Sequence, residues 1–364
     1  MAHRTAELTP VSILYPRPNS TTFSPLPALN ASQPKANLSI AMPCFTMSLG
    51  AISNLIALGI LVKSYARFRR RSRTTFLLLV GALLATDLVG HIIPGAFALR
   101  LYLAKMHWSA VDRSGAFCQL FGACMVFFGL CPLFLSGAMA VERCVGVTRP
   151  LLHSRAVTST HAKLAVALLY ILALLVAALP LAKVGRYSRQ FPDTWCFLQV
   201  HGTLSLADLG LTLVFSGLGL ASLCLSLLCN SLSGLALLQA RLGGSQKLPG
   251  ARQHSTQSHD IEMMAQLAGI TLVSCICWSP FLIFISLSVS KSFSGTDYDL
   301  RHYQWLVFLG VRMASWNQIL DPWVYILLRR AVLRRVYRVL NPHRQLAHSS
   351  FRTMEKDQQN ASLH

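Results

Sequence analysis

The chain has 364 residues, of which 53% are hydrophobic and only 13% charged, and its mean hydropathy is +0.48. Soluble domains contain about a quarter charged residues, so this composition excludes an ordinary soluble protein and indicates a membrane protein. The net charge of +20 would suit nucleic-acid binding if the basic residues gathered on one soluble face. They are split among short segments between apolar runs, so we expect no nucleic-acid partner.

The first segment, residues 1–38, is rich in Pro, Ser, Thr and Asn and has no apolar run that could act as a cleaved signal peptide. We expect an extracellular tail without regular structure, and the first apolar run would direct membrane insertion. Three N-x-[ST] sequons, at Asn19, Asn30 and Asn37, predict glycosylation of this tail.

Seven apolar runs follow, and each is long enough to cross about 30 Å of hydrocarbon at 1.5 Å per residue. All contain polar residues, and several contain glycine or proline, as expected when helices pack on one another and line a cavity. The prediction is an all-α membrane protein with a seven-transmembrane helix bundle over residues 39–327. The runs cover residues 39–63, 75–101, 116–141, 162–184, 209–239, 264–289 and 303–327.

The lysines and arginines between the runs predict the orientation. The first connection, "KSYARFRRRSRT", is strongly basic, whereas the second, "LAKMHWSAVDRSG", has two basic residues beside Asp112. Because cytosolic loops are enriched in Lys and Arg, the N-terminus is predicted to be outside and the C-terminus cytosolic. After the seventh run, residues 328–341 have valines on one face and arginines around them, which predicts a short amphipathic eighth helix on the membrane lipid, followed by a cytosolic tail at 342–364.

Most of the ten cysteines lie inside apolar runs, where they act as small apolar filler. Two differ, because Cys118 begins the third run at its outer end and Cys196 lies in the second outer loop, both facing an oxidising compartment. A disulfide between them would tie this loop over the mouth of the bundle. Cys275 and Cys277 have no neighbouring His or Asp, so we expect no metal site there.

Five short motifs are distributed over the runs. They are "SN" at Ser53–Asn54, "LLATDL" with Asp87, "ERC" at Glu142–Cys144, "CWSP" at Cys277–Pro280 and "DPWVY" at Asp321–Tyr325. Together they resemble the rhodopsin-like (class A) G-protein-coupled receptors. The chain has Glu-Arg-Cys and Asp-Pro where Asp-Arg-Tyr and Asn-Pro are usual, and its fourth run lacks the customary tryptophan.

These departures are similar to the prostanoid receptor subfamily, as are "FFGLCPL", "AVERCVGVTRPLLHS", "TWCF", "VSCICWSPF" and "SWNQILDPWVYILLR". Within the subfamily the likeness is to the receptors for prostaglandin E of subtype 1. The resemblance implies a plasma-membrane receptor, not an enzyme, without cofactors, which binds prostaglandin E and activates a heterotrimeric G protein of the Gq class with calcium release. Prostaglandin F and thromboxane receptors remain alternatives. A transporter is the alternative of another class, although we find no internal repeat of the kind that transporters show.

The seventh run contains Arg312, and a lone charge at mid-membrane costs on the order of 3 kcal/mol on insertion scales. Arg312 lies nine residues before Asp321, roughly 13 Å and about half a turn away, so the two cannot pair within the helix. No acidic residue lies in the outer half of the other runs. In one alternative, the Arg312 side chain extends to the lipid headgroups or to a loop carboxylate, Asp297 or Asp299. In the other, it binds an anion from outside, which by resemblance is the prostanoid carboxylate.

Depth and resemblance together suggest the other ligand-binding residues. Met125 stands where amine receptors have an aspartate. Tyr102 lies roughly 22 Å above Asp87, near the outer mouth, where its hydroxyl either binds the ligand carboxylate or belongs to an ordinary tyrosine at the membrane interface. His91 lies one turn beyond Asp87 and faces the bundle interior, where it binds either the ligand or a neighbouring helix. The resemblance adds loop residues next to Cys196, so that the set is Arg312, Tyr102, Thr194, Trp195, His91, Ser315 and Met125.

The resemblance also implies a set of residues for activation and G-protein coupling. Asp87, Asn54 and Asp321 would form a polar core that holds sodium or water, and a sodium ion near Asp87 is the only metal expected. Arg143 would contact the G protein once the sixth helix moves outward, and a proline would supply the bend for that movement. The set is Asp87, Asn54, Glu142, Arg143, Trp278, Pro280, Asp321, Pro322 and Tyr325.

Overall fold

A computed structural model of the chain describes residues 41–67, 71–105, 107–243, 251–295 and 299–327. The expected outer tail with its three sequons, the amphipathic helix at 328–341 and the cytosolic tail lie outside the described residues. The residues that the structure describes form the helical bundle and its connecting loops.

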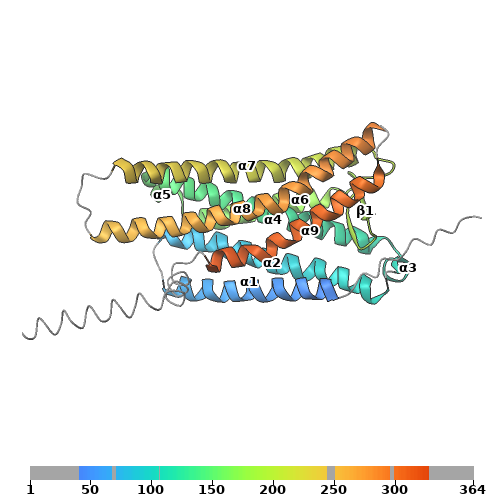
Figure 1. Cartoon of the computed structure of the whole chain (residues 1–364), viewed down its shortest axis with the longest axis horizontal. Helices are drawn as coiled ribbons and strands as arrows, with labels where there is room; N and C mark the ends of the chain where they lie inside the picture. Colours follow the sequence, from blue (N-terminus) through green and yellow to red (C-terminus); the bar gives the residue numbers. More distant parts are fainter. Residues whose placement is uncertain (1–40, 68–70, 106, 244–250, 296–298, 328–364) are drawn as a thin grey trace, which may run out of the picture. The chain divides into compact units, whose positions relative to one another are not determined.

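The described part of the chain contains seven long helices, and each overlaps one of the seven predicted runs. Shorter elements are α3 (Trp108–Val111), α5 (Pro150–Ala156) and an antiparallel hairpin of β1 (Tyr187–Gln190) and β2 (Trp195–Leu198). The long helices lie side by side, with the hairpin and α3 near one end and α5 near the other (Figure 1). We call these the hairpin end and the α5 end. The long helices are α1 (Ala41–Arg67), α2 (Arg71–Leu103), α4 (Ala116–Thr148), α6 (Ser159–Ala178), α7 (Leu206–Gly243), α8 (Ala251–Ser294) and α9 (Leu300–Leu327).

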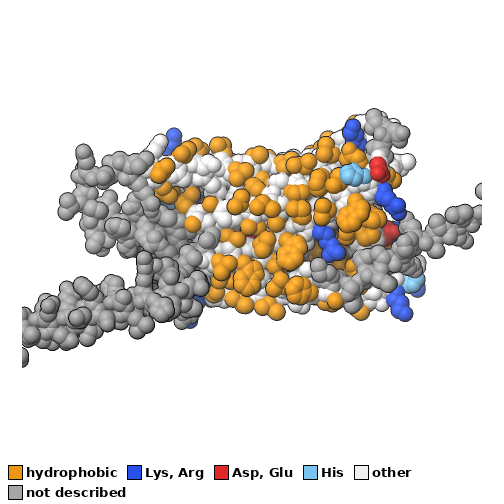
Figure 2. Space-filling model, in the orientation of Figure 1, with side chains coloured by type: hydrophobic (Ala, Val, Ile, Leu, Met, Phe, Trp, Pro, Cys, Tyr) orange, Lys and Arg blue, Asp and Glu red, His pale blue; other side chains and the backbone are white. Residues whose placement is uncertain are grey.

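The surface of the bundle matches a membrane environment. Figure 2 shows hydrophobic side chains over the middle of one face and charged side chains mainly towards its ends. Six of the described helices are long and apolar enough to cross a membrane, namely α1, α2, α4, α6, α7 and α8. The helix α9 is not among them, because Arg312, Asn317, Gln318 and Asp321 lower its hydropathy. These polar residues make α9 the natural place to look for function.

The helix α4 is the centre of the bundle. It contacts α2, α6, α7 and α8 as well as both strands. In its most apolar segment 67% of the residues are buried, against 22% in that of the peripheral α6. Because lipid is as apolar as leucine, packing rather than transfer from water holds such helices together. At Gly310 of α9, an added Cβ would lie 2.7 Å from Phe281 Cα, so the backbones of α8 and α9 touch.

A tyrosine attaches α6, the helix without the customary tryptophan, to α2. The hydroxyl of Tyr170 lies 2.7 Å from Thr86 Oγ1, and Thr86 in turn bonds to the carbonyl of Ala82 in its own helix. An interhelical hydrogen bond of this kind contributes on the order of 1 kcal/mol within a membrane. The sequence pattern alone did not reveal this link.

Candidate functional site

The hairpin closes one end of the bundle and is covalently fixed there. Cys196 of β2 forms a disulfide with Cys118 in the first turn of α4, with 5.5 Å between their Cα atoms. The predicted bridge is therefore confirmed. The carboxylate of Asp112 accepts hydrogen bonds from the backbone N–H groups of Phe117 and Cys118, both at 3.0 Å, and so fixes the start of α4 at the cysteine.

The strand β2 faces inward. Trp195, the first residue of β2, and Thr194 just before it are both buried. The Trp195 ring lies 6.4 Å from the ring of Phe281 in α8. The indole N–H of Trp195 donates to the Phe191 carbonyl at 3.0 Å across the hairpin turn. From α3, the indole N–H of Trp108 donates to the Asp193 carbonyl at 2.8 Å. Thr194 and Trp195 are therefore held in place within the covering loop, and their contact with a ligand, which the family resemblance implies, stays a prediction.

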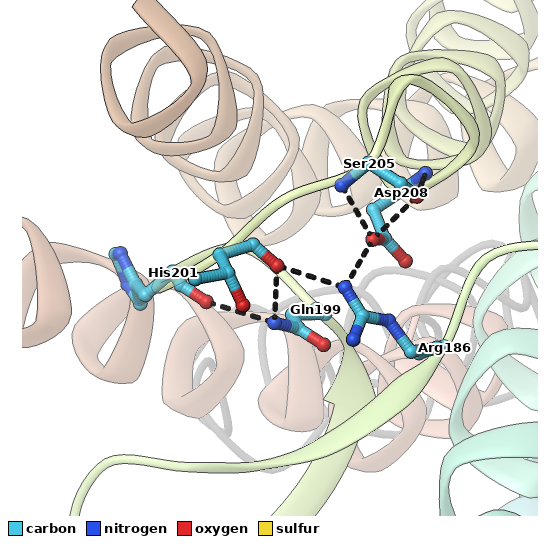
Figure 3. Close-up of polar contacts among 6 residues, drawn as sticks. Arg186, Gln199, His201, Ser205 and Asp208 are labelled. Carbon is cyan, nitrogen blue, oxygen red and sulfur yellow. Dashed lines mark hydrogen bonds and ion pairs between the residues drawn. The ribbon is translucent and has the colours of Figure 1, made fainter. Parts of the chain in front are cut away.

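The other side of this loop is attached to α7 (Figure 3). Arg186 donates to Asp208 Oδ2 at 2.9 Å and to the Thr203 carbonyl at 2.8 Å. The backbone N–H of Ser205 donates to Asp208 Oδ2, and the backbone N–H of Asp208 donates to Ser205 Oγ, the reciprocal arrangement of a capping box. Gln199 donates to carbonyls within the same loop, including that of Thr203. The loop is thus fixed at both edges.

His201 connects the loop to α8. Its ring nitrogens lie 3.3 and 3.4 Å from Ser288 Oγ. Burial lowers the pKa of His201 from its ordinary 6.5 to about 4, because the charged form loses hydration inside the protein. The ring is therefore neutral at physiological pH and contacts the Ser288 hydroxyl as an uncharged partner.

Arg312 lies in α9 near this lid and is partly buried. Its guanidinium is 5.2 Å from the centre of the Phe308 ring, and Phe308 makes an edge contact with Phe191 of the hairpin turn at 6.1 Å. The charge of Arg312 also acts electrostatically on the Tyr102 hydroxyl of α2. Arg312, Tyr102 and the hairpin are therefore neighbours, although they come from distant parts of the sequence. Ser315 is exposed, and its hydroxyl donates to the Arg312 carbonyl at 2.7 Å.

Among the described residues, no carboxylate forms an ion pair with Arg312. Asp299, one of the two alternatives from the sequence, instead accepts the backbone N–H groups of Arg301 and His302 at the start of α9. The other alternative, Asp297, lies outside the described residues. The carboxylate of Asp299 is thus excluded as the partner of Arg312.

His91 is engaged with neighbouring helices. Its Nε2 lies 2.8 Å from the Thr46 carbonyl of α1, and its Nδ1 lies 3.2 Å from Gln318 Oε1 of α9. Gly50 provides the space, since a Cβ there would lie 2.5 Å from the ring. This is the structural alternative for His91, and its contact with a ligand stays a prediction. Met125 is partly buried and packs on the core of the hairpin end.

The predicted polar core lies deeper and is buried. Asn317 donates to Asp321 Oδ2 at 2.8 Å, and Asn54 of α1 donates to the Gln318 carbonyl at 2.9 Å. Asp87 and Asp321 act on each other electrostatically. Both Asp87 oxygens, together with Oδ1 of Asn54, Asn317 and Asp321, lack a hydrogen-bond partner among the described residues. Unpartnered carboxylate and amide oxygens are suitable ligands for a hard cation, so these residues fit a sodium ion.

Two residues of α8, Trp278 and Pro280, are predicted from the resemblance to serve in activation. Trp278 is buried, with its ring 6.1 Å from that of Phe281, and Gly129 of α4 leaves it room, since a Cβ there would lie 3.1 Å from Trp278 Cη2. Pro280 and Pro322 lie inside α8 and α9, where each removes a backbone N–H donor.

At the α5 end, Arg143 is paired with its neighbour Glu142. Arg143 Nη2 donates to Glu142 Oε1 at 2.6 Å, and the Arg143 guanidinium lies 5.0 Å from the Phe76 ring of α2. Tyr325 of α9 is buried, and its carbonyl accepts a hydrogen bond from Gln266 of α8 at 3.4 Å. Arg143 is thus turned inward in this structure.

Comparison with known proteins agrees with this arrangement. Residues 58–325 match the model of the 7 transmembrane receptor (rhodopsin family). The chain belongs to this family. Its seven long helices are therefore the transmembrane helices, and α9 is included despite its polar residues.

Several relatives are named as receptors, not enzymes. The prostaglandin E2 receptor EP1 subtype of Canis lupus familiaris is 47% identical, over 85% of this chain and 83% of that protein. The corresponding receptor of Homo sapiens is 45% identical, over 89% and 88%. The prostaglandin F2-alpha receptor of Homo sapiens is 42% identical, over 84% and 82%.

Two residues in the site escaped the sequence analysis. Gln318 links His91 to α9 and, through its carbonyl, Asn54 to α9; its position three residues before Asp321 was a usable signal. His153 contacts Glu142, although it follows eleven residues later in the sequence and nothing in the spacing indicated a contact.

Proposed function

We propose that this chain is a plasma-membrane receptor for prostaglandin E, which binds the lipid carboxylate from outside and activates a heterotrimeric G protein of the Gq class. Its relatives support the choice of ligand: identity to the prostaglandin E2 receptors of subtype EP1 is 45% and 47%, against 42% to a prostaglandin F2-alpha receptor. The hairpin end faces outside, because the basic first connection lies at the opposite end of α1 and α2.

The observation that carries the proposal is Arg312. A partly buried arginine in a membrane helix, with no ion pair to a described carboxylate and an aromatic ring beneath it, is suited to a carboxylate from outside the chain. Tyr102 and Thr194 would donate hydroxyl hydrogen bonds to the same carboxylate. Ser315, whose hydroxyl bonds to the Arg312 carbonyl, is included in the proposed site. Trp195 and Met125 would contact the apolar chains of the lipid.

In this proposal, His91 exchanges one of its present hydrogen-bond partners for the ligand. Both ring nitrogens already have oxygen partners on α1 and α9, so a ring oxygen of the prostanoid would have to replace one of them. Such an exchange would transmit ligand binding to Gln318, and from there to the polar core around Asp87 and Asp321. Outward movement of α8 about Pro280 and Trp278 would then expose Arg143 to the G protein.

The test is a panel of prostaglandins E, F and D with a thromboxane mimic, applied to cells that express the chain. We expect prostaglandin E to be the most potent ligand and the response to be calcium release. A preference for prostaglandin F would move the assignment to that receptor group without affecting the fold. A rise in cyclic AMP without any phospholipase response would contradict the Gq assignment, and uptake of labelled prostanoid without signalling would favour the transporter alternative.

A further inference from the structure

His153 joins a connecting segment of the bundle to the Glu142–Arg143 pair. Its Nε2 lies 2.9 Å from Glu142 Oε1, the same oxygen that accepts Arg143 Nη2 at 2.6 Å. Arg143 Nε donates to the other carboxylate oxygen. Because an ionised carboxylate only accepts hydrogen bonds, His153 Nε2 is the donor in this contact. One buried carboxylate is thus shared by donors from two elements, α4 and α5.

Among the described side chains of α5, His153 is the only buried one. Leu151 is 81% exposed and Leu152 50%, whereas His153 is 6% exposed; Ser154 and Arg155 are also exposed. Gly146, one turn beyond Glu142, accommodates the ring, because a Cβ there would lie 3.4 Å from His153 Cδ2. A short helix has therefore been anchored to the bundle by a polar side chain instead of an apolar one.

This anchor ends on the carboxylate with which Arg143 is paired in its inward position. Glu142, Arg143 and His153 are all buried, and hydrogen bonds in such surroundings fix the orientation of a carboxylate strongly. With His153 in place, Glu142 Oε1 and Oε2 both stay directed to the guanidinium. Without it, the carboxylate has one donor fewer and α5 loses its buried contact.

We propose that His153 is a positioning residue for activation: it holds the Glu142 carboxylate against Arg143 and so restrains Arg143 in the receptor without ligand. The inference rests on the proposed function in one respect, since release of Arg143 is taken to precede G-protein binding. Loss of the His153 contact shifts the equilibrium towards released Arg143 by roughly tenfold, which corresponds to 1.4 kcal/mol.

The first test needs neither ligand nor G protein. Amide hydrogen exchange is measured on the purified full-length receptor, in peptides that cover α5 and the end of α4. The His153→Ala variant should exchange faster there. The His153→Gln variant should exchange like the parent, because its amide Nε2 supplies a donor close to the position of the imidazole Nε2. The Ser154→Ala variant is the matched control, since Ser154 is an exposed neighbour whose hydroxyl bonds, within the described part of the chain, only to the Leu151 carbonyl.

A second variant background separates the hydrogen bond from mere packing. In Glu142→Ala, the further change His153→Ala should add nothing to the exchange rate, because the contact no longer exists. Equal exchange rates for His153→Ala and His153→Gln, or a full additional increase in the Glu142→Ala background, would overturn the proposal and leave His153 as a packing residue.

Basal signalling provides the functional measurement. At matched surface expression without ligand, His153→Ala should raise basal phospholipase activity several-fold, and His153→Gln should restore it. A chain that fails to respond to prostaglandin E would contradict the proposed function but would leave the exchange result intact. A normal prostaglandin response, with exchange and basal activity unchanged in His153→Ala, would overturn the role of His153 alone.

Discussion

Replacing Arg312 with alanine tests the proposed ligand contact most directly. The guanidinium is only partly buried and lies over Phe308, so its pair with a carboxylate is partly shielded from water. A hydrogen bond to a charged group contributes about 1.5–3 kcal/mol, and two such bonds from the planar fork would lose part of this value to the remaining hydration. We therefore expect a loss of about 3 kcal/mol, which lowers prostaglandin E potency roughly a hundredfold.

The assay is calcium release against prostaglandin concentration at matched surface expression, for the parent, Arg312→Ala and Arg312→Lys. The lysine variant should recover part of the loss, because an ammonium keeps the charge but not the bidentate geometry. The matched control is on the ligand: a prostaglandin methyl ester has no anion, so Arg312→Ala should penalise it far less than the free acid. Equal penalties for acid and ester would refute the reasoning and show that Arg312 supports the bundle instead of binding the carboxylate.

Two further predictions concern the loop that covers the bundle. Cys118→Ser or Cys196→Ser breaks the bridge that fixes the loop with Thr194 and Trp195 over the bundle. Labelled prostaglandin should then bind at least tenfold more weakly at equal surface expression, roughly 1.4 kcal/mol; unchanged affinity in both variants would argue against a role of this loop in binding. The second prediction concerns His201, whose pKa is about 4 in the folded protein and 6.5 ordinarily, so that folding favours the neutral ring. The free energy of unfolding is therefore fully maintained above pH 6.5 and decreases as the pH falls towards 4. At about 1.4 kcal/mol per pH unit the full effect is roughly 3 kcal/mol. Thermal unfolding of the purified receptor between pH 7 and 4.5 should therefore depend on pH more steeply for the parent than for His201→Gln, and identical curves would contradict the assigned cause.

Sequence patterns located the helices because lipid imposes a length and a composition on them. Each predicted run overlaps one long helix, and even the polar α9 was found, since its apolar residues still extend over a membrane thickness. The helix ends were less accurate. The sixth run was expected at 264–289, whereas α8 covers Ala251–Ser294, because helices continue into the aqueous regions beyond the hydrocarbon, where hydropathy carries no signal.

Side-chain partners were predicted less well than positions. The disulfide could be predicted because the sequence assigned Cys118 to the outer end of the third run and Cys196 to an outer loop. The contacts of His91 with Thr46 and Gln318 instead depend on how α1, α2 and α9 are rotated against one another. Helical periodicity gives the face of a residue on its own helix, not the residue opposite to it. The His153 contact was missed for the same reason, because it depends on how the short helix α5 packs against α4.

The buried carboxylates of Asp87 and Asp321 lead to the last prediction. Five oxygens of this polar core lack a hydrogen-bond partner among the described residues, and two carboxylates that repel each other in an apolar interior need a cation or a proton. A sodium ion would stabilise the arrangement seen in this structure, in which Arg143 is paired with Glu142. By linkage, an agonist that favours released Arg143 must then bind more weakly when sodium is present, by a factor on the order of five or more.

Agonist affinity is to be measured in membranes while sodium chloride replaces choline chloride at constant ionic strength. The parent should lose affinity as sodium rises, and Asp87→Asn should be insensitive, because the amide keeps the size of the side chain but removes the charge that holds the ion. Potassium chloride serves as the control, since general screening affects both salts alike. An equal loss of affinity in Asp87→Asn, or an equal effect of potassium, would place the salt effect elsewhere and leave the unpartnered oxygens to water.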